Sequence, residues 1–153
     1  MTDIESAAEI AKIIAEAAPL PLLDAAYALW RRRYRLDTLE RRPTPEEVEI
    51  NRAMTPEQFS VKYRWQRDHA HEGPAFTHLK RAHRRAADDA IKQAIITAVK
   101  FEDACFRYFE QAGDGVEYWQ RCLNAVARAR KEFPGFREDT YRAAANDVAY
   151  YNK

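Results

Sequence analysis

The feature that most constrains the fold is the stretch from residue 75 to residue 112, which contains neither glycine nor proline. Pro74 precedes it and Gly113 follows it. In its second half, apolar and small side chains recur at alternating steps of four and three residues, which places them on one face of a helix. These residues are Ala87, Ile91, Ala94, Ala98, Phe101, Cys105 and Tyr108. We therefore predict one long helix over about 75–112.

The predicted long helix does not fit inside a round molecule. A helix of that length spans about 57 Å, whereas a compact chain of this size is about 38 Å across. Its first part, residues 76–86, carries the least apolar surface. We therefore expect residues 76–86 to extend beyond the core.

Glycine and proline also mark the ends of the other segments. All 4 glycines and all 7 prolines fall in breaks between stretches that are rich in Ala, Leu, Glu, Arg and Lys, which are good helix formers. Short connections between successive helices favour antiparallel neighbours. We predict an all-α fold, a bundle of six to seven helices around the long helix, which forms a single domain over residues 1–153.

Several helix starts are marked by a capping residue that is followed, three positions later, by Glu or Gln. These pairs are Thr2 and Glu5, Thr44 and Glu47, Thr55 and Gln58, and Asp114 and Glu117. One conflict arises in residues 59–66, where apolar and polar residues alternate as in a half-buried strand. The cap at Thr55 favours a helix there, and a short hairpin is the alternative.

The composition excludes several classes of protein. The net charge of +1 argues against a dedicated nucleic-acid binder. No apolar run is long enough to span a membrane, and the N-terminus does not resemble a signal peptide. The 2 cysteines form no disulfide framework, so we expect a cytoplasmic protein. Since Ser6 and Ser60 are the only serines and no glycine-rich phosphate loop occurs, we expect no enzymatic activity and no cofactor.

A basic surface is predicted within residues 64–85. If the chain folds back at Gly73, Arg67 lies level with Lys80 and the neighbouring cations gather around them. The surface would consist of Arg64, Arg67, Lys80, Arg81, Arg84 and Arg85. Acidic segments of the same protein or of a second copy could neutralise it, or an external anion such as a nucleic-acid backbone could bind it. The arginines of residues 25–43 form a second basic patch.

All 4 histidines lie between residues 69 and 83: His69, His71, His78 and His83. The same fold-back would place His69 opposite His78. His69 and His71 are two residues apart, and His78 and His83 are five apart. Neither pair has the four-residue spacing of a helical zinc site. Three interpretations therefore remain: a metal site, a pH-sensitive cluster, and histidines that only cap helices or lie on the surface.

The two cysteines are also brought together by the predicted fold. Cys105 and Cys122 lie level across the hairpin that follows the long helix. They form either a redox pair, half of a metal site or part of the core, and burial in a core is the usual state of cysteine.

The sequence therefore predicts a non-enzymatic, self-associating interaction protein, an adaptor or regulator that recognises a protein partner or a second copy through the basic surface at 64–85. A nucleic-acid-binding module that uses the same residues is the alternative. A metal- or pH-responsive protein that uses the four histidines is the third hypothesis. No membrane partner is expected.

Overall fold

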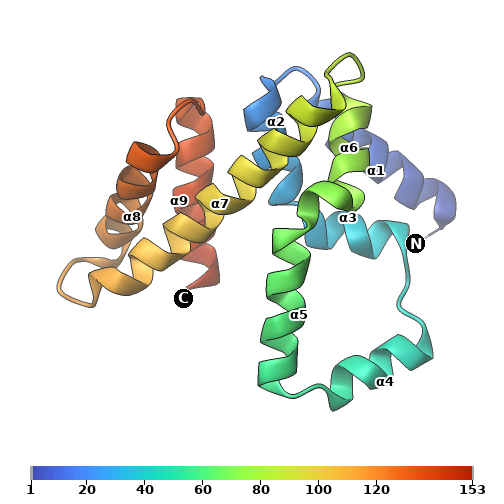
Figure 1. The fold of residues 1–153 in the computed structure, drawn as a ribbon, viewed down its shortest axis with the longest axis horizontal. Coiled ribbons are helices and arrows are strands. Elements are labelled where there is room, and N and C mark those ends of the chain that lie inside the picture. The colour runs from blue at the N-terminus through green and yellow to red at the C-terminus, as the bar shows by residue number, and fades with distance from the viewer. Residues whose placement is uncertain (1, 153) are drawn as a thin grey trace.

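A computed structural model describes residues 2–152, and in this range the chain forms nine α-helices, one short 3-10 helix and no strand (Figure 1). The elements are α1 (Asp3–Ala17), α2 (Leu22–Trp30), α3 (Arg33–Glu40), α4 (Pro45–Ala53), α5 (Pro56–Asp68), η1 (Ala70–Glu72), α6 (Pro74–Ala82), α7 (Asp88–Ala112), α8 (Tyr118–Glu132) and α9 (Glu138–Tyr151). The predicted all-α fold with one long helix is confirmed. The helices are more numerous and shorter than predicted.

Helix α7 is the axis of the molecule and runs diagonally across Figure 1. Helices α8 and α9 pack along its C-terminal half, while α2, α6 and η1 pack along its N-terminal half. Phe101 lies fully buried where the two groups meet. Its ring contacts those of Tyr27, Phe136 and Tyr141 at centroid distances of 5.5, 4.7 and 5.5 Å. The buried residues form one continuous cluster on both sides of α7.

The long helix begins at Asp88 and not near residue 75. Residues 83–87 leave the helical path although they contain neither glycine nor proline. Lys80 holds this turn: its Nζ donates to the carbonyl of Ala86 at 2.8 Å and pairs with Asp88 at 3.0 Å. His83 Nε2 contacts the carbonyl of Leu20 at 2.9 Å. These tertiary contacts outweigh the local helical preference.

The turn also changes the expected position of residues 76–86. Since α6 is a separate helix, it turns back to pack on α1, α2 and α7 instead of extending from the core. Leu79 is fully buried and His78 is buried beside it. The prediction that this segment extends beyond the core is therefore wrong.

The first turn of α8 differs from the predicted cap at Asp114. The helix begins at Tyr118, and the carboxylate of Glu117 accepts from the backbone N–H groups of Trp119 and Gln120, both at 2.9 Å. Gly113 has a φ of 69° and ends α7. Asp114 instead pairs with Arg121 at 3.0 Å. The connection is therefore longer than predicted.

Helices α4 and α5 form an arm (residues 45–68) that projects away from the other helices at the bottom of Figure 1. Thr44 and Thr55 cap the two helices as predicted, and each accepts a backbone N–H bond at 3.1 Å. Residues 59–66 are helical, so the strand alternative is excluded. Among residues 2–152, no helix has the length and apolar character needed to cross a membrane.

Candidate functional site

The predicted basic surface does not form, because the chain does not fold back at Gly73. Helix α5 extends downward from η1 and α6 extends upward from it (Figure 1). Arg64 and Arg67 therefore lie on the arm, whereas Arg81, Arg84 and Arg85 lie at the far end of α6 and in the turn after it.

Arg67 is buried in an ion-pair network at the base of the arm. Its Nη1 donates to Glu102 Oε1 at 2.7 Å and to the Tyr63 hydroxyl at 2.8 Å, and its Nη2 lies 2.8 Å from Asp103 Oδ1. Arg33 pairs with the same Glu102 at 3.2 Å. Burial acts to lower the pKa of Arg67, but the charges of Glu102 and Asp103 raise it by more. The pKa is therefore raised, and the guanidinium stays charged. Arg67 therefore anchors α5 to α7 and is not available to a partner.

Glu102 was not singled out from the sequence, although a signal for it exists. It sits beside Phe101 in α7 and is itself buried. A carboxylate on a buried helical face needs a cation and hydrogen-bond donors nearby. Trp30 Nε1 donates to it at 3.3 Å, in addition to the two arginines.

The other members of the predicted surface divide into two groups. Arg64 pairs with Asp103 at 3.2 Å and Lys80 with Asp88 at 3.0 Å. Arg81, Arg84 and Arg85 are exposed, and no ion pair or hydrogen bond of their side chains is found within residues 2–152. These three arginines are the part of the predicted surface that remains open to an anion.

The four histidines each have a separate partner. His69 stacks on Trp65 with ring centroids 4.3 Å apart, and His71 lies 3.7 Å from Glu72. His78 contacts Glu40 of α3, and His83 contacts the Leu20 carbonyl. No group of three or more His, Cys, Asp or Glu side chains within residues 2–152 is arranged to hold a metal ion. The histidines therefore act as contacts within and between helices.

Both cysteines are buried free thiols. Burial, and after it the charge of Glu102, raises the pKa of Cys105 well above its ordinary value. Burial also raises the pKa of Cys122. Since the thiolate is the reactive form, neither cysteine is poised for redox or metal chemistry. Their place in the core agrees with the packing interpretation.

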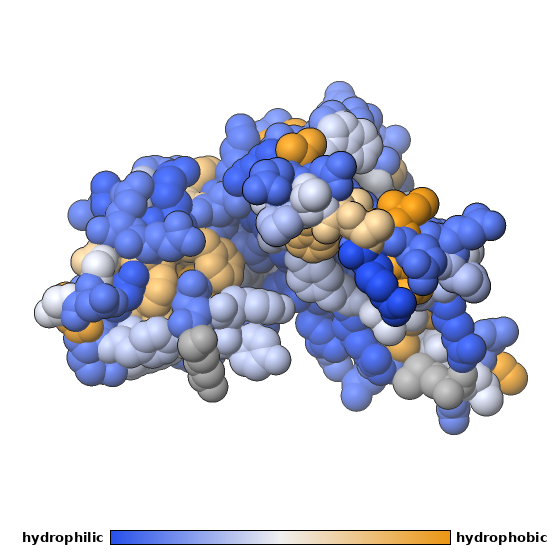
Figure 2. Space-filling model, turned by 90° about the horizontal axis from the view of Figure 1, so that it is seen from below, coloured by the Kyte–Doolittle hydropathy of each residue, from blue (hydrophilic) through white to orange (hydrophobic). Residues whose placement is uncertain are grey.

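The arm exposes apolar side chains that no other part of residues 2–152 covers. Helix α4 contributes no buried residue, and Arg67 is the only buried residue of α5. The exposed fractions are 62% for Ile50, 56% for Phe59, 70% for Val61 and 60% for Trp65. In Figure 2, which views the molecule from below with the arm towards the reader, apolar side chains interrupt an otherwise hydrophilic surface. A helix pair that only supported the core would not leave these groups in water.

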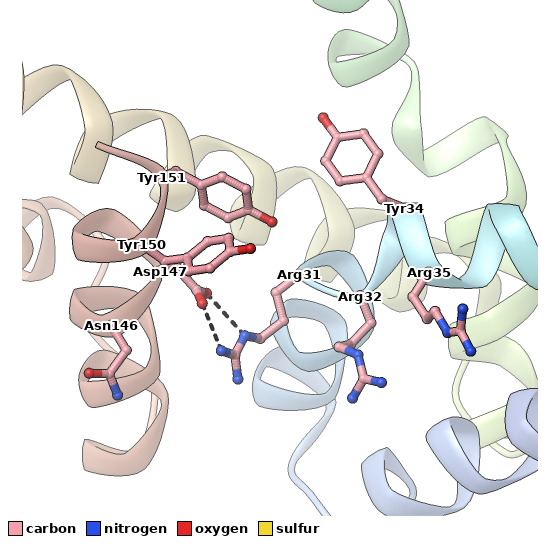
Figure 3. Close-up of a pocket in the computed structure, with 8 residues that line it drawn as sticks. All are labelled: Arg31, Arg32, Tyr34, Arg35, Asn146, Asp147, Tyr150 and Tyr151. Atoms are coloured by element: carbon pink, nitrogen blue, oxygen red, sulfur yellow. Dashed lines mark hydrogen bonds and ion pairs between the residues drawn. The ribbon is translucent and has the colours of Figure 1, made fainter. Parts of the chain in front are cut away.

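A second feature is a cleft of about 520 Å³ between the C-terminal end of α9 and the turn that joins α2 to α3 (Figure 3). We call it the tyrosine cleft; it is lined by Arg31, Arg32, Tyr34, Arg35, Asn146, Asp147, Tyr150 and Tyr151. The helical path breaks here, between the end of α2 and the start of α3. Arg31 turns to Asp147 of α9 at 2.7 Å, while Arg33 turns to Glu102 of α7. The opposed ion pairs explain why the helix ends at Trp30 and restarts at Arg33.

Comparison of the chain with protein-family models, with curated protein sequences and with solved structures gives no match.

Proposed function

We propose that this protein is a non-enzymatic interaction protein that forms a homodimer through its arm. The observation that carries the proposal is the exposure of Ile50, Phe59, Val61 and Trp65 on two helices that are well capped and yet bury almost nothing. Capping keeps the arm helical in the free chain. Its apolar residues are then available to a second surface.

An antiparallel pair of α5 helices fits Val61 and Trp65. Val61 and Trp65 are one turn apart and therefore lie on the same face of the helix. With Val61 at the twofold axis, Val61 meets its counterpart, and Trp65 lies level with Glu57 of the other copy. This is an isologous contact, which closes after two chains.

The charges of α5 complement one another in this arrangement. Glu57 lies in the first turn and Arg64 follows seven residues later, so both lie beside Val61 on one flank of the helix. Reversing the second helix places each Glu57 on the same flank as the Arg64 of the other copy, one residue (about 1.5 Å along the axis) from its level. Arg64 is exposed, and its bond to Asp103 uses only Nη1. It therefore retains donors for a second carboxylate.

The exposed area supports a weak dimer. The exposed parts of Val61 and Trp65, the two apolar side chains on the contact face, amount to on the order of 200 Å² per chain, since a full aromatic side chain presents about 150–250 Å². A standard interface takes about 800 Å² from each partner. The polar flanks of α5 and the neighbouring face of α4 supply the remainder.

Light scattering on the purified protein tests the proposal. We expect a mass that approaches twice 17.8 kDa as the concentration rises. Val61→Glu with Trp65→Glu should give a monomer, because two carboxylates would then face each other across the axis. Ile4→Glu is the matched control, since Ile4 is an exposed apolar residue outside the arm. A monomer mass of the unchanged protein at high micromolar concentration would sink the proposal.

A charge exchange tests the antiparallel register. Glu57→Lys alone should weaken the dimer, and so should Arg64→Glu. Combining the two substitutions restores opposite charges at each level and should recover most of the affinity. A double variant that is weaker than either single variant would exclude this register.

The proposal also covers the role of the dimer and the compartment in which it acts. An adaptor or regulator that pairs in this way would act in the cytoplasm, and the two free cysteines support a reducing compartment.

Binding of a nucleic acid is the second candidate, and the observation in its favour is the open trio Arg81, Arg84 and Arg85. Retardation of DNA or RNA at low salt that is lost in Arg84→Ala with Arg85→Ala would support it, and absence of retardation would remove it.

A further inference from the structure

We infer that the tyrosine cleft binds a planar ring that carries a phosphate, the chemistry of a nucleotide. This site is separate from the arm and does not depend on the proposed dimer. Its volume of about 520 Å³ lies within the range of small-molecule sites.

The floor of the cleft is fixed by Asp147. Arg31 donates to its two oxygens from Nε at 3.0 Å and from Nη2 at 2.7 Å. The buried hydroxyl of Tyr27 donates to the same carboxylate at 2.9 Å. Burial, and after it the charge of Asp147, raises the pKa of Tyr27, so this hydroxyl remains a donor. The three bonds hold α9 against α2 and preorganise Arg31.

The cleft carries one cation more than its carboxylates can neutralise. Asp147 pairs with Arg31, and Glu9 pairs with Arg35 at 2.6 Å. Arg32 is exposed, and no ion pair of its side chain is found in the part of the chain that the structure describes. Arg31 Nη1 also has no acceptor among those residues. A phosphate is the anion whose oxygens match two adjacent guanidinium groups.

The aromatic residues lie on the side of the cleft opposite to the cations. The exposed fractions of Tyr34, Tyr150 and Tyr151 are 53%, 68% and 57%. Figure 3 shows Tyr150 and Tyr151 together on α9 and Tyr34 across the cleft on α3, with the guanidinium groups of Arg31 and Arg32 below the three rings. Tyr151 is braced by Phe106 and Tyr150 at centroid distances of 6.2 and 5.1 Å.

This separation selects a ligand with two unlike ends. A nucleobase has the flat face that stacks on an aromatic ring, and its polar edges can bond to tyrosine hydroxyls. The phosphate of the same unit then reaches Arg31 and Arg32. A bare phosphate would leave the tyrosines in water, and a neutral ring would leave the cations unused.

Titration calorimetry with adenosine monophosphate tests the inference. We expect saturable binding, with adenosine and inorganic phosphate each at least about 10-fold weaker. Arg32→Ala and Tyr150→Ala should each weaken the nucleotide about 10-fold or more, as the loss of a charged bond or of a stacked ring does. Both residues are exposed, so their variants should fold. Arg84→Ala is the matched control, because Arg84 is an exposed arginine that does not line the cleft.

Two outcomes would overturn the inference: no saturable binding up to about 10 mM, or binding that persists unchanged in both cleft variants. The same titration with a short single-stranded oligonucleotide distinguishes a free nucleotide from a nucleotide within a strand. Tighter binding of the strand, lost in the same two variants, assigns the cleft to a strand; equal or weaker binding assigns it to the free nucleotide. Val61→Glu with Trp65→Glu should retain nucleotide binding, which separates this inference from the proposed dimer.

Discussion

The α7–α8 pair and the α4–α5 pair are both successive helices joined by a short connection. The first pair buries its apolar residues, whereas the second leaves them exposed. Helices α7 and α8 bury Phe101, Cys105, Cys122 and Val126 in the common core. Helices α4 and α5 each begin with a capping threonine, and yet they leave Val61 and Trp65 in water. Capping decides where a helix forms, whereas burial depends on what the rest of the chain can bring to it. The unburied pair is the surface that the proposed dimer uses.

The largest test of this contrast compares one phenylalanine from each pair. Phe101→Ala should lower the free energy of unfolding by about 3–5 kcal/mol, because it leaves a cavity among Tyr27, Phe136 and Tyr141. Phe59→Ala, on the arm, should change it by less than about 0.5 kcal/mol. Urea unfolding in the Val61→Glu, Trp65→Glu background measures both without self-association. Similar losses from the two variants would mean that the arm belongs to the core.

The second test concerns the base of the arm, where the buried Arg67 joins α5 to α7. Arg67→Ala leaves Glu102 with only Arg33 and Trp30 as partners, and breaking a buried pair in this way costs about 3–5 kcal/mol. The same unfolding experiment measures the loss, and hydrogen exchange should show α5 opening first. Arg64→Ala is the matched control, since this exposed pair with Asp103 is worth at most about 1 kcal/mol. An equal loss from both arginines would contradict the anchoring role of Arg67.

The same contrast separates what could be predicted from the sequence from what could not. Periodicity predicted the burial of Phe101 and Cys105, and the caps at Thr44 and Thr55 predicted the two arm helices, because both signals are local. The turn at 83–87 has no glycine or proline to mark it. It depends on Lys80 and on the contact of His83 with Leu20, which is distant in sequence.

The candidate sites also depend on contacts between residues that are distant in sequence, which the sequence alone does not show. The sequence indicated a basic surface at 64–85, but it could not show that α5 and α6 diverge at η1 or that Arg67 is buried against Glu102. The arginines of residues 25–43 were predicted only as a second patch. The tyrosine cleft needs Tyr150 and Tyr151 of α9 beside them, a contact between segments that lie at opposite ends of the chain.

A smaller effect is expected at the start of the arm. Thr55 accepts from the N–H of Gln58, and Gln58 accepts from the N–H of Thr55 at 3.0 Å. Thr55→Ala removes the first bond and should destabilise the first turn of α5 by about 1 kcal/mol. Faster hydrogen exchange of the Gln58 amide is the measurement. Ser60→Ala, within the same helix, should not accelerate exchange, because alanine is the better helix former. Unchanged exchange in Thr55→Ala would show that the arm does not depend on its cap.

The smallest expected effect is at the first turn of α8, where the cap is a carboxylate. Two backbone N–H bonds to Glu117 lower its pKa below the ordinary value of 4.5. A lowered pKa in the folded state means that the carboxylate stabilises the fold above the pKa of the unfolded chain, and that this contribution is lost as the pH falls through the folded pKa. Glu117→Gln should therefore lower the melting temperature slightly at pH 7, and the difference from the unchanged protein should shrink as the pH falls below 4.5 and disappear below the lowered folded pKa. Glu117→Asp retains both the charge and the cap, so it should keep the pH dependence. A difference between Glu117→Gln and the unchanged protein that is the same at pH 7 and in acid would show that hydrogen bonding alone, without charge, caps this helix.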